Sequence, residues 1–136
     1  MATAVHQDID GRGGDWSATA GAGILAAEVV VTGDVQKTAD RVFSAVRGRF
    51  FPQQQTTVTN LVTQPTGLTA ADRSTIVSGE VRYRVPGVPS RYDRVVVVVI
   101  ALADGRYTAV VSARPEKTPT ATLDVLDASL ASIRVR

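Results

Sequence analysis

The residues of this chain that could act as general bases or as partners of a nucleophile are few. The sequence contains one histidine, His6, and no cysteine. A serine or threonine nucleophile needs a base held beside it, whereas His6 lies in a stretch rich in glycine and aspartate that is expected to be mobile. Glu28 and Glu80 are the only acids expected within strands, and both are expected on exposed faces, so neither suits a buried carboxylate pair. We therefore predict no catalytic residues, no enzymatic activity and no cofactor.

Three aspartates near the N-terminus stand among glycines, which invites comparison with a calcium-binding loop. The EF-hand pattern requires a glutamate at its twelfth position, and counting from the first of these residues, Asp8, puts Thr19 there. We therefore predict no metal site. Residues 1–15 are expected to form a flexible tail, and residues 16–136 a single domain that begins with the packed side chain of Trp16.

Residues 21–26, GAGILA, match the letters of the dinucleotide-binding pattern G-x-G-x-x-A. That motif must follow a strand and open a helix, whereas residues 27–31 continue with valines typical of a strand. We therefore predict a turn at the glycines, a strand over 24–31 and no nucleotide site.

Arginines gather on the polar side of an alternating strand expected over 75–85 and on the segment that follows it. Arginine suits the recognition of carboxylates and is enriched at binding hot spots. The net charge of +2 is too small to indicate nucleic-acid binding, and a solvated sheet face would show the same alternation. We predict a protein partner and no nucleic acid, with a merely solvated face as the alternative. The predicted contact residues are Arg82, Arg84, Arg91 and Arg94.

The element that must position this face is a β-hairpin over 94–113. Five consecutive valines and Ile100 lead into Asp104-Gly105, after which apolar and polar residues alternate. Asp-Gly between two such runs predicts a two-residue turn with positive φ at both positions. A strand without a polar residue over 95–103 must be covered on both faces, so we expect it at the centre of an antiparallel sheet.

Two amphipathic helices are expected to cover that sheet, which predicts an α+β fold of two layers. Asp34 should cap the first helix and Phe51-Pro52 should end it, while Thr118-Pro119 should open the second. A further strand is expected over 56–63. The apolar stripes of the two helices comprise Val35, Ala39, Val42, Phe43, Val46 and Phe50 in the first and Leu123, Leu126, Leu130 and Ile133 in the second.

This order of elements resembles the Mog1/PsbP-like fold, and in particular the actinobacterial LpqN-type lipoproteins and the domain of type VII secretion-associated proteins. The resemblance covers about residues 16–136 and rests on ADRVFSAVRGRF, VVVVVIALADGRYTAVVSA and DVLDASLASIRVR. It implies a non-catalytic accessory or protein-binding domain that works outside the cytoplasm or on a membrane or secretion complex. The chain shows neither the signal peptide nor the lipobox cysteine of a lipoprotein, so membrane attachment would need a segment outside this sequence. Oligomeric state and compartment stay open.

A cystatin/NTF2-like cone is the alternative architecture, in which the helix wraps a curved sheet around an apolar pocket. Phe43, Phe50, Tyr83 and Tyr107 would then line a cavity for a small hydrophobic ligand. A ligand that copurifies would favour this hypothesis over a protein-binding domain.

Overall fold

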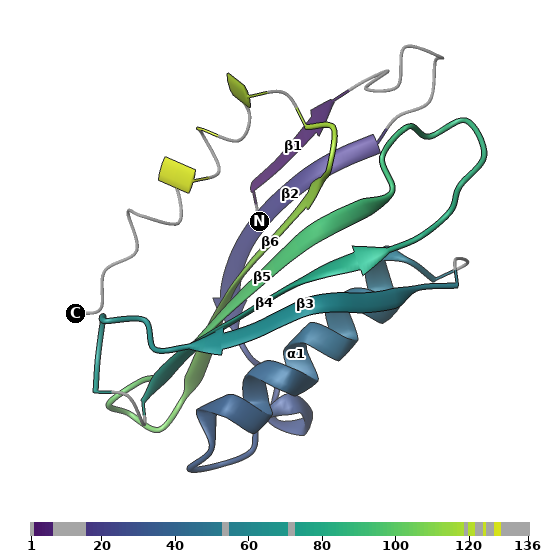
Figure 1. Cartoon of the computed structure of the whole chain (residues 1–136). Coiled ribbons are helices and arrows are strands. Elements are labelled where there is room, and N and C mark those ends of the chain that lie inside the picture. The colour runs from purple at the N-terminus through teal and green to yellow at the C-terminus, as the bar shows by residue number, and fades with distance from the viewer. Residues whose placement is uncertain are drawn as a thin grey trace.

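The fold is an antiparallel sheet with one long helix packed against it (Figure 1). The computed structural model describes residues 2–6, 16–52, 55–70, 73–118, 120, 121, 124, 127 and 128, and the side chains among them from residue 19 onward. The strands pair in the order β1-β2-β6-β5-β4-β3, which confirms the predicted α+β class with an antiparallel sheet. The elements are β1 (Ala2–His6), β2 (Trp16–Ile24), the short 3-10 helix η1 (Ala27–Val29), α1 (Val35–Phe50), β3 (Thr57–Gln64), β4 (Ser74–Arg82), β5 (Tyr92–Ala101) and β6 (Tyr107–Pro115).

The predicted central hairpin is formed by β5 and β6. β5 lies between β4 and β6, and Val97 and Val99 are fully buried, which confirms that the valine run is central. The turn differs from the prediction. The Gly105 amide donates to Leu102 O at 3.1 Å, and Gly105, at φ 86°, is the residue of this loop with positive φ. The loop is therefore one residue longer than a two-residue turn and needs only one left-handed position.

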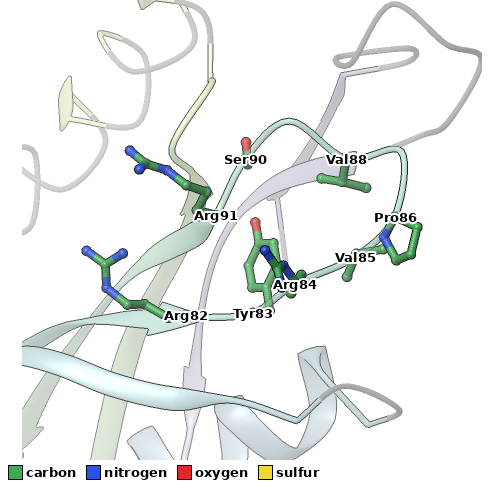
Figure 2. Close-up of a pocket in the computed structure, with 8 residues that line it drawn as sticks. All are labelled: Arg82, Tyr83, Arg84, Val85, Pro86, Val88, Ser90 and Arg91. Carbon is green, nitrogen blue, oxygen red and sulfur yellow. The ribbon is translucent and has the colours of Figure 1, made fainter.

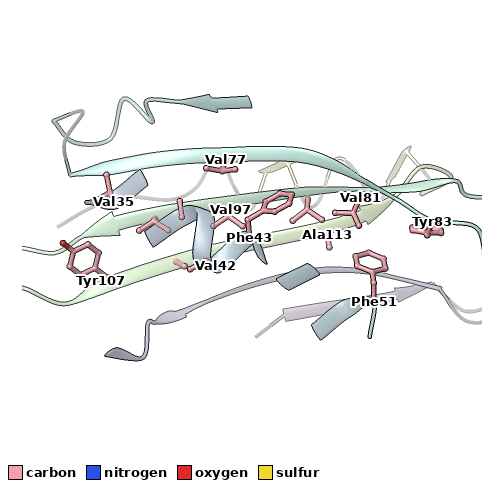
Figure 3. Close-up of a cluster of buried hydrophobic side chains, with 14 residues drawn as sticks. Val35, Val42, Phe43, Phe51, Val77, Val81, Tyr83, Val97, Tyr107 and Ala113 are labelled. Carbon is pink, nitrogen blue, oxygen red and sulfur yellow. The ribbon is translucent and has the colours of Figure 1, made fainter. Parts of the chain in front are cut away.

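Helix α1 spans the residues that its apolar stripe predicts. Asp34 is its N-cap, and the side chain accepts a hydrogen bond from the Lys37 amide at 2.9 Å. The helix packs against β4 and β5, and Figure 3 shows Phe43 of α1 in the buried cluster with Val77 and Val97 of the sheet. A methyl group at Gly79 would come within 3.2 Å of Phe43 Cζ. The missing side chain at Gly79 therefore makes room for the phenylalanine ring.

The strand predicted over 24–31 is wrong, because β2 ends where that strand should begin and η1 follows it. The backbone of Val31 is already used by the start of α1. Its amide donates to Thr38 Oγ1 at 2.9 Å, and its carbonyl accepts from the Asp34 amide at 3.0 Å. Neither group can join a sheet ladder, despite the β-branched sequence around it.

The beginning of the chain also differs from the prediction. Residues 2–6 form β1, which pairs antiparallel with β2, so the expected tail over 1–15 does not hold for this segment. Its backbone makes sheet hydrogen bonds instead. Residues 7–15, which include the aspartates considered for calcium, lie outside the described residues, as do the side chains of His6 and Trp16.

Asp127, one of the described residues near the C-terminus, contacts the face of the sheet opposite α1. Arg114 points away from the α1 side of β6, and its Nη1 donates to Asp127 Oδ1 at 2.6 Å. Helical backbone is described at residues 120, 121, 124, 127 and 128. The apolar stripe predicted for this helix, Leu123, Leu126, Leu130 and Ile133, lies outside the described residues. In the described part of the chain, no helix has the length and apolar character needed to cross a bilayer.

Candidate functional site

The loop from β4 to β5 brings most of the predicted arginines to one end of the sheet. Its tip is a type II turn, in which the Val88 amide donates to Val85 O at 3.1 Å and Gly87 has φ 84°. Pro86 and Gly87 occupy the two central positions, where this turn favours proline and glycine. At the base of the loop, the Tyr83 amide donates to Arg91 O at 3.0 Å. The chain on either side of the turn is therefore held close together.

Tyr83 anchors the floor of this region. Its ring stacks on Phe51 with 5.5 Å between centroids, and its hydroxyl donates to Asp93 Oδ1 at 2.7 Å. Tyr83 and Asp93 are both buried. A buried aromatic ring with its hydroxyl satisfied by a carboxylate is a rigid support for the neighbouring residues.

Two adjoining cavities lie at this end of the sheet, and we call them the arginine cavities. They have volumes of about 580 and 550 Å³, and Arg82, Tyr83 and Arg84 line both of them. The first is completed by Val85, Pro86, Val88, Ser90 and Arg91, and the second by Gln55, Thr56 and Thr57. Figure 2 shows the first cavity, with Arg82 and Arg91 at one end and the apolar residues of the turn at the other.

Arg82 is held in place by three neighbours. Its Nη2 donates to Glu80 Oε2 at 3.1 Å, its Nε donates to Thr59 Oγ1 at 2.9 Å, and its guanidinium lies 4.9 Å from the centre of the Tyr92 ring. Burial acts to raise the pKa of Glu80, but hydrogen bonds from Asn60, Thr59 and Arg82 outweigh it and keep that pKa below its ordinary value. Glu80 is therefore a stable anionic partner for Arg82.

Arg91 is held by Glu116 across the β5–β6 ladder. Its Nη2 donates to Oε1 at 2.8 Å, and its amide donates to Oε2 at 2.9 Å. These hydrogen bonds from Arg91 lower the pKa of Glu116 to about 2. The Arg91 side chain is nevertheless 74% exposed, so it remains accessible to a partner.

The other two predicted arginines are exposed, and neither forms an ion pair within the part of the chain that the structure describes. Arg84 lines both arginine cavities. Arg94 shares a sheet face with Arg82, since it pairs with Glu80 of β4 and with Arg114 of β6, but it lines neither cavity. The structure thus places Arg82, Arg84 and Arg91 at the cavities and Arg94 outside their lining.

The aromatic residues predicted for an apolar pocket line no common cavity among the cavities formed by described residues. Phe43, Tyr83 and Tyr107 are buried in the core, and the Tyr107 hydroxyl accepts from the Gly33 amide at 2.8 Å. Phe50 alone of the four lines an apolar groove, beside β2. In the described part of the chain, α1 packs directly on the sheet and fills the space that a cone would leave open.

Sequence reasoning misses two of the residues that orient the arginines. Thr59 and Glu116 are far in sequence from Arg82 and Arg91, and no local motif marks them. Glu80 lies two residues before Arg82 in β4, so strand alternation already puts these two side chains on one face. Phe51 is missed as the stacking partner of Tyr83, although its aromatic type just after the helix could have indicated packing. Among the described residues, no three histidine, cysteine, aspartate or glutamate side chains gather closely enough to hold a metal ion.

Neither a scan against protein-family models nor a search of curated proteins finds a match to this chain.

Proposed function

We propose that this chain is a non-catalytic binding domain that recognises a carboxylate-bearing segment of a partner protein at the arginine cavities. The observation that carries the proposal is the convergence of Arg82, Arg84 and Arg91 around adjoining cavities, with Arg84 free of any ion pair among the described residues. A planar guanidinium with several donors matches the geometry of a carboxylate.

The internal ion pairs orient two of the arginines without using all their donors. Arg82 and Arg91 each donate through Nε and Nη2, and the structure assigns no acceptor to either Nη1 among the described residues. Long side chains that are already ordered lose less conformational entropy on binding. Val85, Pro86 and Val88 add an apolar surface beside these donors, which suits a peptide rather than a free ion.

The residues that line the cavities favour binding over catalysis. The Tyr83 hydroxyl donates to Asp93, and Ser90 Oγ accepts from the Lys117 amide at 3.1 Å. No nucleophile and base are paired among these lining residues. The resemblance to the Mog1/PsbP-like fold supports an accessory role on an extracytoplasmic or secretion complex, which forms part of the same proposal.

The test compares an acidic peptide with a neutral one. Fluorescence anisotropy would measure binding of labelled hexaglutamate and hexaglutamine to the parent chain, to Arg84→Gln and to Arg41→Gln. Arg84→Gln should weaken hexaglutamate binding about twofold to fivefold, the range of an exposed ion pair. Arg41, an exposed residue of α1, lines neither arginine cavity, so its variant is a matched control for lost charge. Equal binding by all three proteins would favour a merely solvated face.

A capture experiment then addresses the natural partner. The parent chain and the double variant Arg82→Glu/Arg84→Glu would be used to recover proteins from an extract of the native host. We expect a partner whose recovery depends on both arginines. Identical recovery by the two proteins would place the contact elsewhere.

A further inference from the structure

A third cavity lies between α1 and β2, away from the arginine-lined loop, and we call it the α1–β2 groove. It has a volume of about 230 Å³ and a predominantly apolar lining. Its walls include Val46 and Phe50 from the last turns of the helix and Gly21 and Val111 from the sheet. Val46, Phe50 and Val111 are only half-buried. The groove thus exposes apolar side chains that the core has not covered.

The groove exists because α1 is displaced toward one side of the sheet and β2 carries small residues. The helix packs against β4 and β5, whereas Gly21 of β2 pairs with Val111 of β6 beyond them. Gly21 and Gly23 lie within the strand, not in the turn that their sequence predicts, and a methyl group at Gly23 would meet nothing within 4 Å. No side chain from these positions fills the space beside the helix.

A single cation lines this groove. Arg49 is exposed, and it forms no ion pair with any residue that the structure describes. The other arginine of the last turn, Arg47, is occupied, since its Nε donates to Thr56 Oγ1 at 2.6 Å. Because the C-terminal end of a helix carries partial negative charge, an anion could bind here only through Arg49.

The size of the groove limits what it can hold. Its 230 Å³ is below the ~300–1,000 Å³ typical of drug-sized sites, yet it exceeds the ~150 Å³ cavity known to admit benzene. One short alkyl chain or one ring fits this range. An apolar lining with one cation matches a molecule that is apolar along its length and carries one negative charge.

We propose that the α1–β2 groove binds a single-chain aliphatic carboxylate, with the alkyl chain against Val46, Phe50 and Val111 and the carboxylate on Arg49. This site is independent of the arginine cavities, with which it shares no residue. The domain would then carry a ligand site between α1 and β2 and a partner site at the loop from β4 to β5.

The test uses decanoate and its uncharged counterpart decanol, both below the concentrations at which they aggregate. Isothermal titration calorimetry should show saturable binding of decanoate to the parent chain. Arg49→Gln should weaken decanoate binding about twofold to fivefold and leave decanol binding unchanged. Arg41→Gln removes the same charge from the same helix outside the groove, and it should behave as the parent.

A second variant blocks the groove itself. Ala45 is an exposed helix residue in the groove lining, so Ala45→Trp should fill the space without removing a core contact and should abolish binding of both compounds. Amide chemical shifts of the parent chain provide a readout that needs no variant. Decanoate should move the resonances of Gly21, Ala45 and Val111. Absence of saturable binding, or shifts confined to Arg84 and its neighbours, would overturn the proposal.

Discussion

The two halves of the sheet face beside α1 use glycine in opposite ways. In β4, the space above Gly79 is filled by Phe43 of the helix and by Leu61 of β3, both within 3.2 Å of where a methyl group would stand. In β2, the space above Gly23 is open, and Gly21 lines the α1–β2 groove. A missing side chain therefore leaves a cavity only where no neighbouring element fills the space.

The largest effect on stability is expected in the half of the sheet that α1 covers, around β4 and β5. Val97 is fully buried at the centre of β5. Val97→Asp would place a charge in this fully buried site among apolar side chains, at a cost of several kcal/mol, which should unfold the domain. Circular dichroism and thermal denaturation provide the measurement. A cooperative transition near the midpoint of the parent would contradict the central placement of this strand.

A matched pair of glycine substitutions tests the comparison directly. Gly79→Ala forces Phe43 Cζ and Leu61 Cδ1 to move by a few tenths of an ångström and should destabilise the chain by about 1 kcal/mol. Gly23→Ala meets no atom within 4 Å and should leave stability unchanged or raise it by about 0.5 kcal/mol. Urea denaturation of both variants gives the difference. Equal effects would show that the two halves are packed alike.

Lowering the pH should weaken the ion pair between Glu116 and Arg91, which orients Arg91 at the arginine cavities. The pKa of this residue is lowered from 4.5 to about 2 by Arg91, so its stabilising effect is complete above pH 4.5 and is lost as the pH falls toward 2. Since Arg91 is 74% exposed, solvent screening limits the effect to about 1 kcal/mol.

Urea denaturation at pH 6 and pH 3 tests this expectation. The parent chain should lose more stability on acidification than Glu116→Gln, which cannot form the charged pair. Glu28→Gln, at an exposed residue of η1, serves as the control and should follow the parent. Equal losses of stability in all three proteins would show that Glu116 does not cause the acid sensitivity.

The smallest change in stability is expected from a substitution on the face of the sheet opposite α1. Ser112 is buried there, and its Oγ has no hydrogen-bond partner among the described residues. Because an unsatisfied buried hydroxyl is costly, Ser112→Ala should preserve stability or raise it by up to about 1 kcal/mol. A Ser112→Ala midpoint clearly below that of the parent in thermal denaturation would reveal a partner for this hydroxyl.

Several elements follow from the sequence alone because their signals are local. The cap at Asp34 and the apolar stripe after it predict α1 over its observed length, and the valine run with its Asp-Gly turn predicts β5 and β6. Pro86 and Gly87 have the residue types that a type II turn favours at its two central positions, and such a turn forms in the loop after β4. Three of the four arginines predicted as contact residues line the cavity at this loop.

The remaining features depend on which segments the tertiary structure brings together. The valines before Asp34 have strand propensity, but the backbone of Val31 is hydrogen-bonded to the beginning of α1, so the strand forms earlier in the chain. Glu116 meets Arg91 only through the pairing of β5 with β6. The α1–β2 groove is likewise set by where the helix lies on the sheet. Local propensity acts over a few residues, whereas hydrogen-bond competition, strand register and helix placement involve residues far apart in sequence, so only the folded chain decides them.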